Sequence, residues 1–200
     1  MSLQVINQDE LKISVKLQGI PLQYANALRR ICLNGVPIFA IDTVDVLENS
    51  SILADEGIAH RLGLIPLKTD LSTIETTSDS DKIMLTLDSG DTTETRTIFS
   101  GDIKSQDGVI KPISDKIPIV TLAPNQKIRF EAHARLGRGT EHAKWNSSNI
   151  ATLTETDKDN EHILTVETTG ALEPKHIVLA SINELSNRLN NFKETMSDLK

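Results

Sequence analysis

Five histidines are the residues of this chain with the widest chemical range, because a neutral imidazole can bind a metal ion or accept a proton. They are His60, His133, His142, His162 and His176. The histidines form no H-E-x-x-H pattern, and the single cysteine, Cys32, gives no paired Cys/His spacing. The sequence therefore predicts no metal site.

Two glycines, Gly137 and Gly139, begin like a loop that could cradle a phosphate group. His142 stands where the third glycine of that pattern belongs, and no G-K-[ST] follows. The chain also lacks a G-x-S-x-G elbow, a cysteine nucleophile with a nearby base, and an evident acid and base pair. We expect no catalytic residue and no nucleotide cofactor.

Composition is that of a globular protein with an acidic balance. The 200 residues are 38% hydrophobic and 24% charged, with a net charge of −7. Such a surface repels a phosphate backbone, and aromatic residues, at 3%, supply few platforms for unpaired bases. Strong direct binding to nucleic acid is not expected. A local basic strip runs through Lys127, Arg129, Arg135, Arg138 and Lys144.

No apolar run approaches the roughly 20 residues that cross a bilayer, and the first residues lack the pattern of a secretory signal. We therefore expect a cytoplasmic protein that makes no contact with membranes. Cys32 lies on an apolar stripe and has no second cysteine to pair with, so a buried, inert thiol is expected.

The first part of the chain predicts a strand, a helix and a second strand. Apolar and polar residues alternate from 11 to 17, which is typical of a half-buried strand. Pro21 suits the start of a helix, and Gly35 with Pro37 suits its end. The run 38–47 is rich in Ile, Val and Thr and predicts a strand that returns along the sheet covered by that helix.

The last part of the chain predicts a strand over 162–168 and a long helix from Pro174. Apolar residues recur on this helix at intervals of four and three, close to a heptad seam. They are Val178, Ile182, Leu185, Leu189, Phe192 and Met196. Two interpretations stay open: an amphipathic helix that packs only on its own sheet, or an interface with another chain.

The middle of the chain predicts a β-rich region. Between Thr69 and Gly108 the sequence is dominated by Asp, Ser, Thr and Gly, with apolar residues alternating from Ile83 to Leu87. The runs 117–122 and 127–135 predict two further strands joined by a turn.

Three motifs resemble one protein family. NALRRICLNGVP, from Asn26 to Pro37, resembles a helix of the alpha-like subunits of multisubunit RNA polymerases. DEGIAHRLGLIPL, over 55–67, resembles the archaeal and eukaryotic branch of that family. ARLGRGTEHAKW, over 134–145, is similar to the pattern of the archaeal D subunits.

The resemblance implies an α+β fold, in which a dimerisation domain made of a sheet covered by two helices is interrupted by an inserted β-rich domain. Residues 1–46 and 160–200 would form the first domain and residues 47–159 the second. It also implies a non-catalytic assembly subunit of an archaeal RNA polymerase that pairs with subunit L and serves as a platform for the large catalytic subunits.

The residues implied in pairing with subunit L are Leu28, Ile31, Val178, Ile182, Leu185, Leu189 and Phe192. Those implied in contacts with subunit N or the large subunits are Arg29, Arg30, His60, Arg61, Lys144 and Trp145. Catalytic magnesium would be held by the large subunits.

Many archaeal D subunits carry an extra cysteine-rich, ferredoxin-like domain before the terminal strand. Here a short polar linker is expected between Trp145 and His162, and the cysteines for a cluster are missing, so no iron-sulfur centre is expected. The alternative hypothesis is a homodimeric binding module, which would use the terminal helix for self-association and the basic strip for an acidic ligand.

Overall fold

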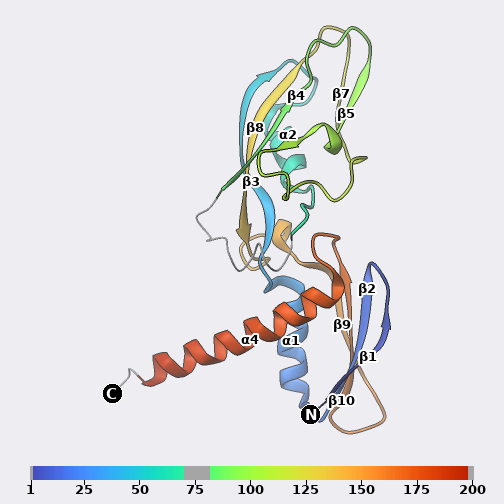
Figure 1. Ribbon diagram of the computed structural model, residues 1–200, viewed down its shortest axis with the longest axis vertical. Helices are drawn as coiled ribbons and strands as arrows, with labels where there is room; N and C mark the ends of the chain where they lie inside the picture. Colours follow the sequence, from blue (N-terminus) through green and yellow to red (C-terminus); the bar gives the residue numbers. More distant parts are fainter. Residues whose placement is uncertain (1, 70–81, 198–200) are drawn as a thin grey trace. The chain divides into compact units, whose positions relative to one another are not determined.

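The computed structural model describes residues 2–69 and 82–197 (Figure 1). The chain divides into two compact units, Met1–Pro37 with Arg138–Lys200, and Ile38–Gly137. These boundaries differ from the expected ones, because residues 38–46 join the second unit and residues 138–159 join the first. Strand pairing explains both differences: the strand that begins at Ile38 pairs only within the second unit, and a strand within 138–159 pairs only within the first.

The first unit is an antiparallel sheet with two helices on one face (Figure 1). Its strands are β1 (Ser2–Gln8), β2 (Lys12–Gln18), β9 (Ser148–Glu155) and β10 (Glu161–Thr168), in the order β1-β2-β10-β9. The helices are α1 (Leu22–Asn34) and α4 (Pro174–Ser197). The expected sheet covered by two helices is therefore confirmed.

The alternation that predicted β2 is what builds the core of this unit. Val15 pairs with Leu164 of β10, and Ile13 pairs with Val166. All four side chains are almost completely buried, because they point to the face that the helices cover. Their polar neighbours along both strands are more exposed, as a half-buried strand requires.

Strands β1 and β9 form the two edges of this sheet, and neither was predicted from the sequence. Every residue of β1 is exposed, so the strand has no buried face, although Leu3 and Val5 alternate with polar residues in the sequence. Strand β9 occupies half of the segment that was expected to be a polar linker between Trp145 and His162. That expectation was wrong because an edge strand with a mostly exposed surface is polar in composition.

The second unit is the β-rich insert that the resemblance implied. One sheet has the order β3-β8-β4-β6, and a smaller sheet pairs β5 with β7. The bounds are β3 (Ile38–Asn49), β4 (Ile83–Asp88), β5 (Arg96–Phe99), β6 (Lys104–Ser105), β7 (Pro118–Leu122) and β8 (Ile128–Gly137). Helix α2 (Asp55–Gly63) buries Ile58 and Leu62 in a hydrophobic core that also contains Phe39 and Phe130.

Strand β3 has the predicted position in the sequence but a different partner. It was expected to return along the sheet that the first helix covers. It pairs instead with β8, from Ile38 opposite Gly137 to Asn49 opposite Ile128. The composition of a run identifies a strand, whereas the choice of its neighbour depends on contacts far apart in the sequence.

Candidate protein-interaction surface

Helix α4 packs on its own unit through its first turns only. Its buried residues are Pro174, Ile177, Val178 and Ser181, and none follows Ser181 up to Ser197. In Figure 1 the later part of the helix projects beyond α1 and the sheet of the same unit. At about 1.5 Å per residue, this 24-residue helix is about 36 Å long, which is more than the sheet can cover.

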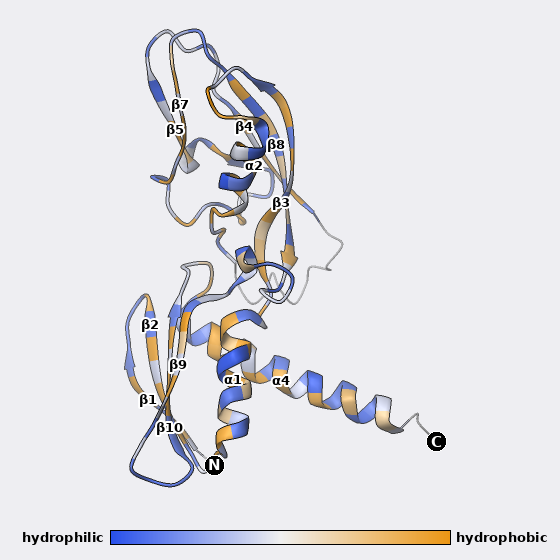
Figure 2. Ribbon diagram, turned by 180° about the vertical axis from the view of Figure 1, so that it is seen from behind, coloured by the Kyte–Doolittle hydropathy of each residue, from blue (hydrophilic) through white to orange (hydrophobic). Residues whose placement is uncertain are grey.

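The uncovered part of α4 carries a line of large apolar side chains, here called the α4 stripe. It consists of Ile182, Leu185, Leu189, Phe192 and Met196. The exposed fractions are 39% for Ile182, 53% for Leu189, 65% for Phe192 and 54% for Met196. Orange and blue segments alternate along this helix in Figure 2. A contiguous exposed apolar surface of this kind is typical of an interaction site.

Three of the residues that were expected to face a partner belong to the core of the first unit. Leu28 and Ile31 on α1 are 6% exposed, and Val178 on α4 is 4% exposed. They pack the two helices on the sheet, so they offer little surface to another chain. Periodicity placed all three on an apolar face but could not tell which part of that face the chain covers itself.

An apolar groove, here called the α1–α4 groove, lies beside the start of the α4 stripe. Its volume is about 330 Å³, and nearly all of its lining is apolar. The lining residues are Ser2, Leu3, Leu17, Ile20, Tyr24, Leu28, Ile182 and Leu185. Because Ile182 and Leu185 belong to both features, the groove and the stripe form one continuous surface.

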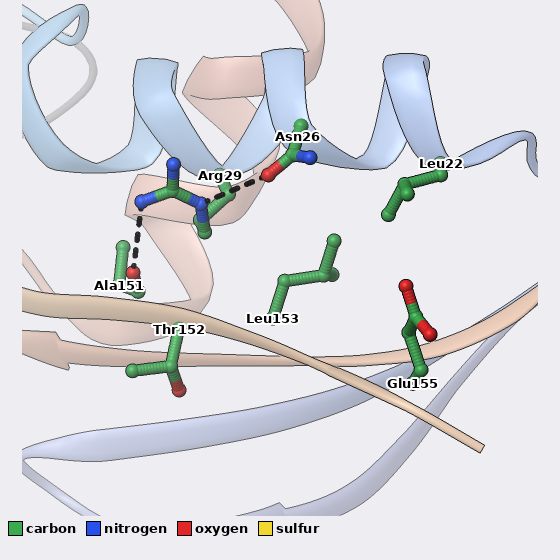
Figure 3. Close-up of a pocket in the computed structure, with 7 residues that line it drawn as sticks. All are labelled: Leu22, Asn26, Arg29, Ala151, Thr152, Leu153 and Glu155. Atoms are coloured by element: carbon green, nitrogen blue, oxygen red, sulfur yellow. Dashed lines mark hydrogen bonds between the residues drawn. The ribbon is translucent and has the colours of Figure 1, made fainter.

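Arg29, on the other side of α1, is held by its own unit. Its Nε donates a hydrogen bond to Asn26 Oδ1 at 3.3 Å, and its Nη1 donates to the carbonyl oxygen of Ala151 at 3.4 Å. Figure 3 shows these contacts at a shallow pocket of about 460 Å³ between α1 and β9, with Glu155 at its other end. Arg29 therefore fastens α1 to the edge strand.

Arg30 follows directly but is exposed and makes no hydrogen bond or ion pair with the residues that the structure describes. Its planar guanidinium group is well suited to a carboxylate or backbone carbonyl of another chain. Of the two arginines, Arg30 is the one that is available to a partner.

His60 and Arg61 lie on the last turn of α2, in the second unit, and both are exposed. The Arg61 Nη2 group donates a hydrogen bond to the carbonyl oxygen of Pro118 at 2.8 Å, which ties α2 to β7. His60 remains accessible on the surface of this unit. The predicted partner contacts thus lie on both units.

Trp145 is an internal residue of the first unit, with an exposed fraction of 2%. The Lys144 ammonium group lies 4.3 Å from the centre of its ring, within the range of a cation–π interaction. The ring of His142 meets it edge-on at 6.5 Å between centroids. Trp145 was expected to contact another subunit, but its burial leaves almost no surface for such a contact.

Three of the five residues of the basic strip form ion pairs with acidic neighbours. Arg135 Nε lies 2.9 Å from Asp42 Oδ2, and Lys127 forms an ion pair with Asp91. Arg138 Nη2 lies 3.6 Å from Glu184 Oε2. An acidic ligand would have to compete with these pairs, so the arrangement gives little support to the alternative hypothesis.

Cys32 is buried on the inner face of α1, as expected. Burial raises the pKa of its thiol from 9.0 to about 11, because desolvation disfavours the thiolate. Its carbonyl oxygen accepts hydrogen bonds from Ser147 Oγ at 2.9 Å and Ser148 Oγ at 2.8 Å. The residue is therefore a packing element with an unreactive side chain.

Over residues 2–69 and 82–197, no group of three or more His, Cys, Asp or Glu side chains is arranged to hold a metal ion. Within the same residues, none of the helices is both long and apolar enough to span a membrane. The features that the structure does bring together are those of a surface for binding protein.

A sheet under two helices, interrupted by a β-rich insert, defines the class of alpha-like polymerase subunits. Residues 41–157 match the family described as the RNA polymerase Rpb3/RpoA insert domain. The chain belongs to the alpha-like family of RNA polymerase subunits, in the branch of the archaeal D subunits, also called Rpo3. The resemblance noted in the sequence is therefore confirmed.

Its relatives include DNA-directed RNA polymerase subunit Rpo3 of Pyrococcus horikoshii and of Pyrococcus furiosus, each 44% identical over 146 residues. These matches cover 72% of this chain and 56% of each relative. The Rpo3 subunit of Thermococcus kodakarensis is 47% identical over 142 residues, which are 68% of this chain and 52% of the relative. The chain thus spans about half the length of the curated relatives it matches.

Proposed function

We propose that this chain is a non-catalytic assembly subunit of an archaeal DNA-directed RNA polymerase in the cytoplasm. It pairs with subunit L, and the pair forms the platform on which subunit N and the large catalytic subunits dock. The observation that carries the proposal is the α4 stripe, a row of large apolar side chains on the half of a helix that its own unit leaves uncovered.

Burial of this surface would supply the free energy of pairing. Complete burial of a large aliphatic or aromatic side chain contributes roughly 1.5–3 kcal/mol, and four of the five stripe residues are 39–65% exposed, while Leu185 is less exposed. Several such side chains, with the adjoining α1–α4 groove, form the apolar centre of an interface. An obligate pair of this kind buries on the order of 2,000 Å² in total.

We propose that other subunits carry out the chemistry of the polymerase. The sequence contains no recognisable nucleophile, base or phosphate-binding pattern, and the carboxylates and histidines of the described residues form no metal-binding cluster. We also propose that the chain holds no iron-sulfur cluster. Such clusters are held by several cysteine thiolates, and this chain has only the buried Cys32.

The mass of the native protein tests the pairing. The chain is expressed alone and together with subunit L of the same organism, and both preparations are weighed by native mass spectrometry. We expect a one-to-one complex in the second preparation, and monomer or aggregate in the first, since the stripe is then uncovered. A stable homodimer that ignores subunit L would contradict the proposal and favour the homodimeric binding module.

Arg30→Ala tests the platform function separately from pairing. We expect the variant to pair normally with subunit L but to recruit the large subunits about tenfold more weakly, which corresponds to one charge-assisted hydrogen bond. Recruitment is measured by titrating the purified pair with the large subunits. Arg29→Ala is the comparison variant, because Arg29 is already bonded to Asn26 and Ala151. Equal recruitment by wild type and Arg30→Ala would show that Arg30 is only a surface charge.

A further inference from the structure

The sheet of the first unit has an open edge at β9, beside α1. Strand β9 pairs with β10, and among the strands that the structure describes none lies on its other side. We infer that this edge binds one extended segment of a polymerase subunit other than subunit L as an added strand. The segment carries an apolar side chain beside Leu153 and a basic side chain beside Glu155. This inference rests on the proposed function and adds a second contact with the same polymerase.

The direction of the backbone groups of β9 follows from its pairing with β10. Just beyond the strand, the N–H group of Thr156 donates a hydrogen bond to the carbonyl oxygen of Glu161 at 3.3 Å. In an antiparallel pair, residues bonded to the partner strand alternate with residues that are not. The register is regular from 150 to 155, so the even-numbered residues bond to β10. The N–H and C=O groups of Ala151, Leu153 and Glu155 therefore point to the open edge.

Most of these outward groups have no partner in the described residues. The carbonyl oxygen of Ala151 accepts the hydrogen bond from Arg29 Nη1 at 3.4 Å, which agrees with the outward direction. Between residues 2–69 and 82–197, no other hydrogen bond reaches the outward groups of Leu153 and Glu155. An added strand would bond to them at the regular spacing of a sheet.

The edge also lacks the features that usually prevent strand addition. Such edges carry Lys, Pro or a bulge, and the sequence of β9, SNIATLTE, contains neither Lys nor Pro. Its register shift lies at the start of the strand, between 148 and 150. In β1, at the opposite edge, the shift lies in the middle, between Val5 and Asn7, and interrupts the ladder. Of the two edges, β9 offers the longer regular ladder.

A pocket of about 460 Å³ lies between this edge and α1 (Figure 3). Leu153 pairs with Leu164, which is buried beneath the helices, so the side chain of Leu153 is on the helix side of the sheet. Leu22 and Asn26 of α1 line the pocket from the other side. A strand added along β9 would place alternate side chains in this pocket. One of them would bury the exposed apolar surface of Leu22 and Leu153.

The charges of the pocket lie at its two ends. Arg29 Nε and Nη1 already donate to Asn26 and Ala151. Glu155, at the other end in Figure 3, is exposed, and its carboxylate forms no hydrogen bond or ion pair with the residues that the structure describes. A basic side chain of the added strand would therefore find an unpaired carboxylate.

Subunit L would not cover this edge. The proposed pairing uses the α4 stripe and the α1–α4 groove, where α1 contributes Tyr24 and Leu28. The pocket beside β9 is lined by different residues of the same helix, Leu22, Asn26 and Arg29. The two surfaces share no residue, so one chain can bind subunit L and an added strand at the same time.

Amide hydrogen exchange tests strand addition in the complete polymerase. Exchange is measured by mass spectrometry at single-residue resolution, in the pair with subunit L and in the assembled enzyme. We expect the amides of Leu153 and Glu155 to exchange about tenfold more slowly, or slower still, in the assembled enzyme, because each gains a hydrogen bond. The amides of Thr152 and Thr154 already bond to β10 and should be protected in both samples. Equal exchange of Leu153 and Glu155 in the two samples would overturn the inference.

Protection of Leu153 and Glu155 in the pair alone would also overturn it. Protection that increases with the concentration of the pair would mean that a second copy of the chain covers the edge. Protection that is independent of concentration would mean that subunit L or the chain itself covers it.

Leu153→Lys tests the apolar contact, since it places an ammonium group in the pocket. We expect the affinity of the pair for the remaining polymerase subunits to fall tenfold or more. Thr154→Lys is the matched control: it adds the same charge to the same strand, but on the face opposite to the pocket, and should change this affinity less than threefold. Circular dichroism checks that both variants fold. Equal affinities of the two variants would contradict strand addition at this edge.

Failure of this inference can be told apart from failure of the proposed function. If the wild-type chain forms no complex with subunit L, or the polymerase assembles without the chain, the proposed function is wrong. If the polymerase takes up the chain while Leu153 and Glu155 exchange as freely as in the pair, the proposed function stands and only the added strand is wrong.

Discussion

Leu189→Asp is expected to abolish pairing with subunit L, with a loss of affinity on the order of 100-fold or more. Leu189 lies in the middle of the α4 stripe and is 53% exposed in the free chain. A carboxylate there would be buried without a partner in the complex, which costs several kcal/mol of binding free energy. Affinity is measured by titration with subunit L, and circular dichroism checks that the helix remains.

Asn190→Asp is the control for this prediction. It introduces the same charge one residue further along, at an exposed position away from the stripe, and should leave affinity within about threefold of wild type. Because neither position is buried, neither variant should unfold the first unit. Similar affinities for Leu189→Asp and wild type would mean that the stripe is not the interface.

Local patterns in the sequence predicted the elements whose two faces differ. Strand β2 and helix α1 each have one face against the core, so period-two and period-3.6 patterns are visible in their residues. Helix α4 was predicted for the same reason, and the surplus length of its stripe over its own sheet was also visible. The resemblance to the family rested on three motifs, of which only the one that begins at Asn26 lies in one of these elements, α1.

Long-range pairing could not be predicted in the same way. The first domain was expected to include residues 38–46, because this strand was expected to return along the sheet that the first helix covers, but it pairs with β8, about ninety residues away. Strand β9 was missed because most of its side chains are exposed at the edge of the sheet. The boundaries of both units depend on these two strands.

The sequence predicted only part of the candidate site, and the part that it missed has a physical explanation. An apolar stripe is the same signal whether the chain or a partner covers it, and only the structure separates Val178, which is buried, from Leu189, which is exposed. The motif around Lys144 and Trp145 has the same ambiguity. The residues of a family motif can either stabilise the fold or contact a partner. The burial of their side chains in the chain's own unit distinguishes these two roles.

Trp145→Ala is expected to lower the free energy of unfolding of the first unit by roughly 3–5 kcal/mol. The substitution removes the largest kind of side chain from a nearly closed site and leaves a cavity that its neighbours cannot fill. It also removes the ring over which the Lys144 ammonium group lies. Denaturant unfolding of the complex with subunit L, followed by circular dichroism, measures the change.

Lys144→Ala removes the cation but leaves the indole ring packed in its site, so it measures the cation–π contribution alone. It should cost only about 0.5–1 kcal/mol, the usual contribution of a cation–π contact at an accessible site. If Trp145 were mainly a contact with another subunit, Trp145→Ala would leave the unfolding free energy close to that of wild type and would weaken recruitment of the large subunits instead. Because the indole ring is buried, we expect Trp145→Ala to lower the stability of the first unit strongly. Any loss of assembly should be a consequence of that lower stability.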